Sequence, residues 1–443
     1  MKKISVVFFV ILIVLPLLSV VTYLVLPDSW APIDIWERLA QFTGTIAISL
    51  MSVAMILVTR FRWLEQRLDG LDKAYRLHKW LGIAALLASI GHWLVTRILE
   101  NLEESRELHK NIVLETGLVN APIEAFLGRL HFPAMVLAHI GFYSAVILII
   151  VALTKNIPYR FFAYSHRVIA LSYLFLVFHS VVLMDIRTWT QPAGVVTALL
   201  LTGGVVAGAF SLFGQIGRSN RATGQIRSLL PFPDIRVIEA NIELDNKWKG
   251  HRSGQFAFVT FDRREGKHPY TIASAWDPER RNITFITRGL GDYTDTLPEG
   301  LEIGDTVLVE GPYGCFTFDD VKERQIWIAG GIGITPFIAR MKQLATMPGT
   351  QEIDLFFAAS QEHQEVEKLL EADAAAAKVN LHLVIDGRDN PLTGQRLRKI
   401  VPDWQSASVW FCGPALFGKA VRNDLVANGF RVDDFHQELF NMR

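Results

Sequence analysis

Cysteine is scarce in this sequence, and neither sign of charge predominates. The only cysteines among its 443 residues are Cys315 and Cys412, so the chain has neither a disulfide framework nor a cysteine-rich zinc site. Lysine and arginine together number 44, as do aspartate and glutamate. The formal net charge is therefore zero, and nothing in the composition favours a nucleic-acid partner.

Charged residues are also rare in six long stretches of the first half. These stretches span residues 4–26, 41–59, 80–98, 131–153, 163–184 and 194–213. Each has roughly the 20 residues that a helix needs to cross a bilayer. The first lacks the small residues of a signal-peptide cleavage site, so we interpret it as a retained helix. Residues 1–213 are thus predicted to form a six-helix, all-α transmembrane bundle surrounded by lipid.

Basic residues indicate the orientation of this bundle. They gather between the second and third stretches, between the fourth and fifth, and after the sixth. They are Arg60, Arg62, Arg67, Lys73, Arg76 and Lys79, then Lys155 and Arg160, then Arg218 and Arg221. The positive-inside rule therefore predicts a multi-pass protein of the inner or plasma membrane with both termini in the cytoplasm.

Four histidines bracket two of the apolar stretches. His78 and His92 lie 14 residues apart around the third stretch, and His166 and His179 lie 13 apart around the fifth. Each pair spans roughly 20 Å of helix, and ionisable residues inside a membrane indicate function. The two stretches run in the same direction, so His78 and His166 lie towards the cytoplasm and the other two towards the outer face. Opposed imidazoles at two depths are what two bis-histidine haems need.

Other interpretations of these residues stay open. A lone membrane histidine is more often a packing residue, and we interpret His131 and His139 in that way. On an ideal helix, a separation of thirteen residues turns His179 about 140° away from the face that carries His166. The second helix would therefore need a bend, or its ligands would approach from different sides. Several basic residues near the helix ends are either partners of haem propionates or snorkelling side chains. They are Arg97 and Arg187 at the outer end and Arg76, Lys79 and Arg167 at the inner end.

The second half of the chain has a different pattern. After a predicted linker over 214–228, short β-rich runs separated by turn residues predict an antiparallel β-barrel over 229–320. Over 321–443, four strand-and-helix units and a last strand in His-Gln-Glu-Leu-Phe predict an α/β, Rossmann-like domain with a doubly wound parallel sheet.

Two motifs lie at the predicted carboxyl edge of that sheet. Gly-Gly-Ile-Gly-Ile-Thr-Pro over 330–336 leaves a strand and opens a helix, where glycines let a pyrophosphate approach the backbone. Many such turns are only tight turns, but its place in the first unit favours nucleotide binding. Phe-Cys-Gly-Pro over 411–414 ends the fourth strand. There Cys412 is either beside a nicotinamide ring or a buried strand cysteine.

Two more motifs lie in the predicted barrel. His-Pro-Tyr-Thr-Ile-Ala-Ser over 268–274 offers an aromatic face, hydroxyls and backbone donors. Arg288 precedes Gly-Asp-Tyr-Thr over 291–294 at a predicted helix start, where a guanidinium and backbone N–H groups can hold a diphosphate.

Taken in order, these motifs resemble the ferric reductase / NADPH oxidase superfamily, specifically its compact bacterial members, over residues 40–443. The His-x13-His and His-x12-His pairs resemble its haem-ligand pattern, and HPYTIAS resembles its flavin motif. RGLGDYT resembles its diphosphate-binding segment, and GPYG, GGIGITPF and FCGP resemble its NAD(P)H-binding segments. The resemblance implies a di-haem transmembrane domain followed by a ferredoxin-NADP-reductase-like module.

The resemblance also implies roles for individual residues. His78 with His166 would hold the inner haem, and His92 with His179 the outer one. The implied FAD-binding residues are His268, Pro269, Tyr270, Thr271, Ser274, Arg288, Asp292 and Thr294. Those facing NADPH or NADH would be Gly331, Gly333, Thr335, Pro336, Cys412, Gly413 and Pro414.

Two places depart from the family pattern. Relatives often end on an aromatic residue that covers the flavin, and Phe440 is the nearest candidate here. Relatives that prefer NADPH often carry a basic residue after the second Rossmann strand, where this chain reads Ser-Gln-Glu-His over 360–363. Arg388 is the candidate substitute, so the choice between NADPH and NADH stays open.

These motifs predict a flavohaem oxidoreductase that moves electrons from cytoplasmic NAD(P)H through FAD and two b-type haems to an outer acceptor. That acceptor would be dioxygen, giving superoxide, or ferric iron in a chelate, and no obligatory protein partner is evident. The alternatives are a nucleotide-binding transporter or sensor without haem, and a haem protein that draws its electrons from quinol.

Overall fold

The computed structural model describes residues 2–25, 32–107, 122–154, 157, 159–289, 294, 295 and 297–438. The chain divides into two compact units. The helical unit comprises Met1–Leu68 and Lys73–Ile216, and the reductase unit comprises Asp69–Asp72 and Gly217–Arg443.

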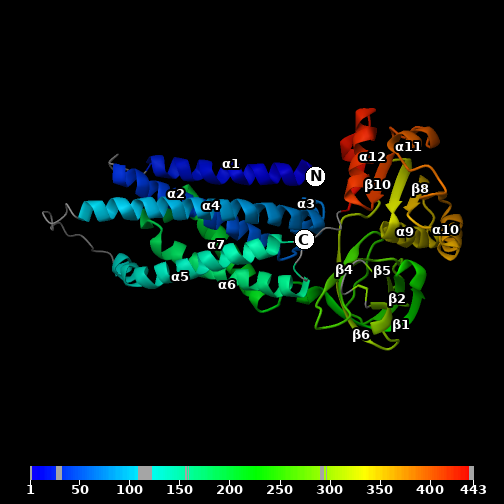
Figure 1. The fold of residues 1–443 in the computed structure, drawn as a ribbon, viewed down its shortest axis with the longest axis horizontal. Helices are drawn as coiled ribbons and strands as arrows, with labels where there is room; N and C mark the ends of the chain where they lie inside the picture. The colour runs from blue at the N-terminus through cyan, green and yellow to red at the C-terminus, as the bar shows by residue number, and fades with distance from the viewer. Residues whose placement is uncertain are drawn as a thin grey trace. The chain divides into compact units, whose positions relative to one another are not determined.

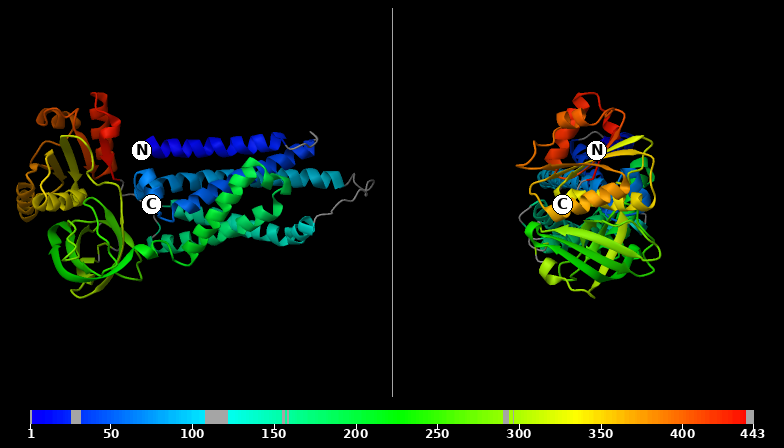
Figure 2. Two further views of the ribbon diagram at one scale, coloured as in Figure 1. Left: turned by 180° about the vertical axis from the view of Figure 1, so that it is seen from behind. Right: turned by 90° about the vertical axis from the view of Figure 1, so that its right-hand side faces the viewer.

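The helical unit is built from six long helices that run alongside one another (Figures 1 and 2). They are α1 (Lys2–Val25), α2 (Pro32–Leu57), α4 (Leu71–Glu107), α5 (Pro122–Leu153), α6 (Tyr159–Leu183) and α7 (Pro192–Leu212); α3 (Arg62–Leu68) and the 3-10 turn η1 (Ile186–Thr190) are short. Within the described residues, six helices are long and apolar enough to cross a membrane. The prediction of a multi-pass membrane protein is therefore confirmed.

Large apolar side chains cover the outside of this unit, which is the reverse of a protein surrounded by water. Phe9, Phe132, Ile147 and Leu199 are each at least 59% exposed, a pattern that suits contact with lipid tails. Inside, α5 packs along α6 and α2 along α7.

Small residues allow the closest of these helix contacts. A Cβ added at Gly204 on α7 would lie 2.0 Å from the Tyr173 hydroxyl and 3.2 Å from the Ser52 backbone. The Tyr173 hydroxyl is in turn 2.8 Å from the Ser52 Oγ. Three helices therefore meet at a hydrogen-bonded pair that only a glycine can accommodate, as is usual in membrane bundles.

The reductase unit begins with an antiparallel barrel. Its strands are β1 (Arg221–Phe232), β2 (Val237–Leu244), β3 (Phe256–Thr260), β4 (His268–Thr271), β5 (Asn282–Arg288) and β6 (Thr306–Tyr313), with short helical turns η2 (Arg218–Asn220), η3 (Pro233–Ile235) and α8 (Leu297–Gly300). The strand order is β4-β3-β6-β1-β2-β5. A further bridge from Ile272 to Phe285 joins the two edges, which closes the barrel around a buried apolar core.

The predicted linker over 214–228 is too long, because β1 already begins at Arg221. The buried positions at the start of β1 alternate at Ala222, Gly224 and Ile226. Alanine and glycine give a weak hydrophobic signal, so the period of two that marks a strand is hidden in the sequence.

A parallel sheet with helices on both faces completes the unit, as predicted. Its elements are β7 (Arg324–Gly330), η4 (Gly331–Ile334), α9 (Thr335–Thr346), β8 (Glu352–Ala359), α10 (Gln364–Ala377), β9 (Asn380–Ile385), α11 (Gly394–Ile400), β10 (Ser408–Cys412), α12 (Ala415–Ala427), η5 (Val432–Asp434) and β11 (Phe435–Gln437). The strand order β11-β10-β7-β8-β9 puts β10 beside β7, and this neighbourhood brings the two glycine motifs together.

Gly204→Ala should destabilise the helical unit by about 1–3 kcal/mol, because the new methyl group overpacks a site bounded by the buried Tyr173 ring and the Ser52 backbone. Gly203→Ala is the matched control. Its Cβ would meet only the Cδ1 end of the Ile56 side chain, at 2.9 Å, which can move aside. Melting of the detergent-solubilised protein, followed by circular dichroism, measures both. Equal midpoints for the two variants would contradict this account of the packing.

Candidate functional site

The four membrane histidines lie in two facing pairs between α4 and α6. The ring centroids of His78 and His166 are 5.8 Å apart, and those of His92 and His179 are 6.4 Å apart. Helix α6 is unbroken across both of its histidines, and each of the two rings faces a ring on α4.

Helix α2 fixes the protonation of both α4 histidines. The Nδ1 of His78 lies 2.9 Å from the carbonyl oxygen of Ala54. Because a carbonyl only accepts, this Nδ1 must carry the proton, which leaves a lone pair on Nε2. The Nδ1 of His92 lies 3.2 Å from the Thr43 Oγ1, and that hydroxyl donates to the Leu39 carbonyl at 2.8 Å. The Thr43 oxygen therefore accepts from His92, and the Nε2 of His92 is also left as the free lone pair.

The spacing of the rings fits a metal ion between each pair. An imidazole–metal bond is about 2 Å long, so two rings on opposite sides of one ion have centroids on the order of 6 Å apart. Both measured separations are close to this value. The Nδ1 atoms of His166 and His179 are buried without a hydrogen-bond partner among the described residues, which is not expected of histidines that serve only for packing.

The space around α4 also fits a planar group. Among the described residues, no other element approaches the α4 backbone at more than isolated points. All four histidines are only half-buried, although they lie in the apolar part of the bundle. The histidines therefore bridge a gap between α4 and α6 that the helix backbones leave open, and these residues fit two haems.

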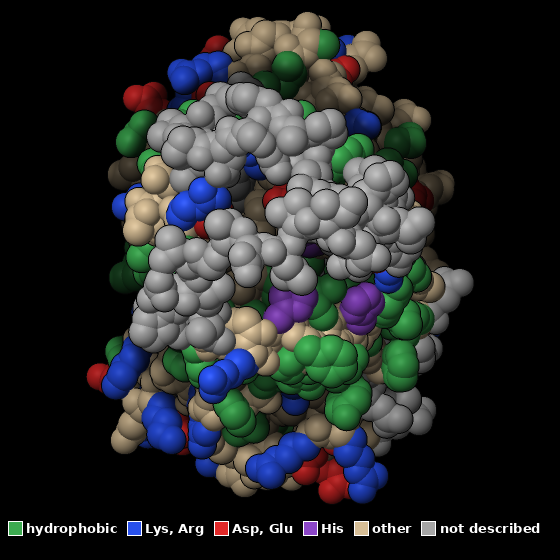
Figure 3. Space-filling view, turned by 90° about the vertical axis from the view of Figure 1, so that its left-hand side faces the viewer, with side chains coloured by type: hydrophobic (Ala, Val, Ile, Leu, Met, Phe, Trp, Pro, Cys, Tyr) green, Lys and Arg blue, Asp and Glu red, His purple; other side chains and the backbone are tan. Residues whose placement is uncertain are grey.

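His139, Arg97 and Arg187 in the helical unit have local partners. The Nδ1 of His139 is 2.8 Å from the Met135 carbonyl, and its Nε2 is 3.4 Å from an Arg97 nitrogen. Arg97 pairs with Glu100 at 2.6 Å, and Arg187 pairs with Asp185 at the same distance. Figure 3 looks onto the left-hand side of Figure 1, where the helices end, and shows histidine side chains beside hydrophobic ones. His139 thus has the hydrogen bonds of a packing residue.

In the reductase unit, the two predicted nucleotide motifs contact each other through their backbones. A Cβ added at Gly333 would lie 2.2 Å from the Cys412 carbonyl, and one at Gly330 would lie 2.7 Å from Pro414. Gly331 has a φ of +55°, a left-handed conformation that favours glycine. The turn is therefore bare backbone at the start of α9, a suitable cradle for a pyrophosphate.

Threonine is a residue type that often caps a helix. Thr335 does not cap α9, because it is already the first helical residue and the 3-10 turn η4 runs directly into the helix. Its hydroxyl donates instead to the Ile332 carbonyl at 2.8 Å. Pro336 occupies one of the first helical positions, where its missing N–H leaves no carbonyl unsatisfied.

Arg288 links the barrel to this turn. It ends β5, and a Cβ added at Gly331 would lie 3.6 Å from its Nη1. Its Nε is buried and has no hydrogen-bond partner among the described residues. A cation with an unused donor beside bare backbone is what a diphosphate requires. Of the segment that follows, Thr294 is described, whereas Asp292 lies outside the described residues.

Residues 268–274 form β4 and the segment after it. Tyr270 lies near Phe261 and Phe285, with ring centroids 5.8 and 6.4 Å away, so its ring packs against the barrel core, and its role towards a flavin stays a prediction. The Ser274 Oγ accepts a hydrogen bond from the Thr284 N–H at 3.0 Å, which ties the end of the motif to β5.

His251 supports the same motif and was missed by the sequence analysis. The Trp248 indole, which can only donate, lies 3.4 Å from the Nδ1 of His251. The proton is therefore on Nε2, which donates to the Ser274 carbonyl at 3.0 Å. Burial lowers the pKa of His251 to about 4, so the ring stays neutral at physiological pH. The bracketing residues Trp248 and Trp276 were the available sequence signal.

Cys412 and Phe440 were predicted to act in catalysis. The Cys412 side chain is fully buried in the core of the parallel sheet, and burial raises the pKa of its thiol well above the usual value. It is therefore a neutral thiol at physiological pH, and its place beside a nicotinamide ring stays a prediction. Phe440 lies outside the described residues.

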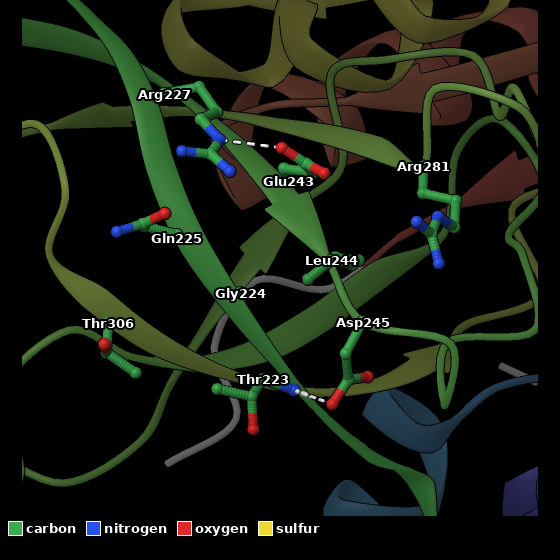
Figure 4. Close-up of a pocket in the computed structure, with 9 residues that line it drawn as sticks. All are labelled: Thr223, Gly224, Gln225, Arg227, Glu243, Leu244, Asp245, Arg281 and Thr306. Atoms are coloured by element: carbon green, nitrogen blue, oxygen red, sulfur yellow. Dashed lines mark hydrogen bonds and ion pairs between the residues drawn. The ribbon is translucent and has the colours of Figure 1, made fainter.

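A shallow hollow of about 330 Å³ lies elsewhere on the barrel (Figure 4). It is lined by Thr223, Gly224, Gln225, Arg227, Glu243, Leu244, Asp245, Arg281 and Thr306. Arg227 and Glu243 pair across it at 2.7 Å. None of these residues is a predicted site residue, so this hollow is separate from the flavin and nucleotide motifs.

The buried His251 should make the stability of the reductase unit depend on pH. The unfolded chain takes up a proton near pH 6.5 and the folded one only near pH 4. Stability is therefore lost as the pH falls through this window, by up to about 3 kcal/mol. Urea unfolding followed by tryptophan fluorescence, at several pH values, measures the loss. His251→Gln keeps a donor and an acceptor without titrating, so its profile should be flatter; two parallel profiles would exclude this role of His251.

Comparison with known proteins supports the two-part organisation. Residues 43–177 match the family model described as "Ferric reductase like transmembrane component". The chain is 28% identical over 210 residues to the glycine betaine monooxygenase reductase subunit of Chromohalobacter salexigens, covering 43% of this chain and 56% of that protein. It is 26% identical over 196 residues to the toluate 1,2-dioxygenase electron transfer component of Pseudomonas putida, covering 42% and 58%. The chain thus spans about half the length of these relatives.

Solved structures overlap with parts of the chain at low identity. One is a ferredoxin NADP+ reductase from Neisseria gonorrhoeae with bound FAD and NADP, at 16% identity and a TM-score of 0.43, over 49% of this chain and 98% of that one. Another is the flavohemoglobin from Malassezia yamatoensis, at 19% identity and a TM-score of 0.47, over 91% and 98%. Together, the family match over residues 43–177 and the fold of the two units show a membrane protein with a ferric-reductase-like transmembrane component, followed by an antiparallel barrel and a parallel α/β sheet.

Proposed function

We propose that this protein moves electrons from cytoplasmic NAD(P)H, through FAD and two b-type haems, to an acceptor on the outer side of the membrane. The acceptor is dioxygen or a ferric chelate. The observation that carries the proposal is the pair of facing imidazoles at each of two depths, with α2 holding the two α4 rings in the form that can bind a metal.

The four histidines would hold the two haems in this proposal, and the haems would supply one-electron transfer across the membrane. His78 and His166 hold the inner haem, and His92 and His179 hold the outer one. The Ala54 carbonyl and the Thr43 hydroxyl orient the α4 rings, as outer-shell partners of metal-bound histidines generally do. With an imidazole from α4 and one from α6 at each site, these residues would leave no coordination position for the acceptor.

The reductase unit supplies the electrons. Arg288 and the backbone around Thr294 hold the diphosphate of FAD, while residues 268–274 hold its flavin half. The bare backbone of Gly331, Gly333 and Gly413 receives the dinucleotide. FAD supplies the chemistry that converts a two-electron hydride donor into single electrons, which a haem iron can carry. Relatives named as a reductase subunit and an electron transfer component support this direction of flow.

The orientation of the chain follows from its basic loops. Three arginines follow α2: Arg60 before α3, and Arg62 and Arg67 within it. The positive-inside rule places such a basic segment in the cytoplasm. Both termini and the nucleotide site then face the cytoplasm, where NAD(P)H is available.

Haem content is the direct test of this function. The purified full-length protein should show a b-type absorption spectrum with two haems per chain. His92→Leu and His166→Leu should each lose about one haem, because removal of one axial ligand opens one site. His139→Leu is the matched control, since its ring has local partners on α5 and Arg97, and it should keep both haems. Reduction of the haems by NAD(P)H, without added quinone, should fail in His166→Leu.

The alternatives make different predictions for the same samples. A colourless wild-type protein would favour a transporter or sensor whose second half only binds nucleotide. Haems that are reduced by quinol and not by NAD(P)H would place the flavoprotein half outside the main reaction.

Arg288 should contribute strongly to the binding of FAD. Arg288→Leu removes a charge-assisted hydrogen bond, and FAD should bind about 10- to 100-fold more weakly. Arg281→Leu is the control, because Arg281 lines the separate hollow of Figure 4. Flavin fluorescence during titration of the flavin-depleted protein gives both affinities. Equal affinities in the two variants would contradict the diphosphate role.

A further inference from the structure

The ends of β8 and β9 form one fixed corner of the parallel sheet. The N–H of Asp386, just after β9, donates to the carbonyl of Ala359 at the end of β8, at 2.9 Å. The turn that follows is closed by the Asp389 carboxylate, which accepts from the Ile385 N–H at 2.9 Å. Residues 360–363 and 386–389 are therefore neighbouring loops at the carboxyl edge of the sheet.

Arg388 lies in this corner, and two of its guanidinium nitrogens pair with acidic residues. Its Nη1 is 2.9 Å from Glu362 and 3.1 Å from Glu367, and its Nε is 3.3 Å from Asp389. Glu367 is itself held in place, because it accepts from the His363 N–H at 3.3 Å and is only 13% exposed. One positive charge thus faces three carboxylates, which leaves the corner negative.

The position of this corner relates it to the nucleotide. The glycine turn follows β7, and β8 is the next strand in the sheet. In sheets of this kind, the residue at the end of that second strand meets the adenosine ribose. A carboxylate there accepts hydrogen bonds from the ribose 2′-hydroxyl, whereas a free cation there accommodates a 2′-phosphate. Glu365, in the first turn of α10, adds a further negative charge on the same side.

We infer that the nucleotide site selects NADH over NADPH, with Glu362 accepting from the ribose hydroxyl and Arg388 acting as a clamp on the acidic residues. The inference rests on the proposed function of the reductase unit and narrows its electron donor. A 2′-phosphate carries about −1.5 to −2 charges at neutral pH. It would have to displace three carboxylates from Arg388 before it could pair with that side chain, and their repulsion would remain.

Kinetics and binding on the full-length holoenzyme test the inference separately. Anaerobic flavin reduction by NADH and by NADPH gives the two values of kcat/KM, and NADH should lead by about tenfold or more. Calorimetric titration with NAD+ and NADP+ gives the affinities without any turnover, and NAD+ should bind more tightly by a similar factor.

Two variants assign the effect to this corner. Arg388→Ala should lower kcat/KM for NADH by about tenfold, because Glu362 loses the partner that holds it in place, whereas a phosphate-binding Arg388 would affect only NADPH. Glu362→Gln removes one repelling charge and should narrow the preference for NADH by about tenfold. Arg398→Ala is the matched control. Arg398 lies on α11 and also pairs with a carboxylate, that of Asp424 on α12, at 3.0 Å. It should not change the preference.

The outcomes are distinguishable from failure of the proposed function. If neither nucleotide reduces the flavin but NAD+ still binds more tightly than NADP+, the electron-transfer proposal fails and the selectivity stands. Equal or tighter binding of NADP+, or an Arg388→Ala variant that loses NADPH activity while its NADH activity is unchanged, overturns the inference. Absence of binding by both nucleotides overturns it as well.

Discussion

The helical unit depends on imidazoles that span a gap. Helices α4 and α6 do not pack against each other closely, and His78, His92, His166 and His179 meet across the space between them. The other contacts of the bundle leave this space in place, because α5 packs on α6 while α2 packs on α7. Helix α2 also reaches the two α4 rings, so that three helices together define each pair.

Much of this could be predicted from local sequence patterns, and the parts that could not are those set by non-local contacts. Long apolar runs gave the six spans, and the regular alternation of strands and helices gave the parallel sheet. The start of β1 was missed because Ala222 and Gly224 carry too little hydrophobic signal. Thr43 and His251 were missed because their roles come from partners in other segments, His92 on α4 and the Ser274 carbonyl after β4. Neither spacing nor residue type reveals such hydrogen bonds.

The reductase unit uses side chains and backbone for different tasks. Where the two glycine motifs meet, a Cβ at Gly333 would collide with the Cys412 backbone. The contact between the two motifs is therefore made by peptide groups, and a side chain at Gly333 would not fit. Charge enters from elsewhere, through Arg288 at the end of β5 and the acidic corner after β8 and β9. Sequence motifs identified the backbone part, because glycine is required there. They left the charge of the corner open, because the same Arg388 can be a free cation or a paired one, and only its three partners decide between the two.

Among the described residues, the Nδ1 atoms of His166 and His179 are buried without a hydrogen-bond partner. The free-energy cost of such atoms favours a ligand-binding role for these histidines. A buried polar atom without a partner costs about 1–3 kcal/mol, and no water is available in a hydrocarbon core to relieve that cost. Packing alone would be served as well by leucine or phenylalanine at His166 and His179, without this loss. The α4 rings lead to the same conclusion from the opposite direction, since Thr43 and Ala54 satisfy one nitrogen of each ring and direct the lone pair of the other away from α2. One nitrogen of each α4 ring is thus satisfied, and each ring faces a second imidazole across the gap, which is the arrangement that the proposed haems would need.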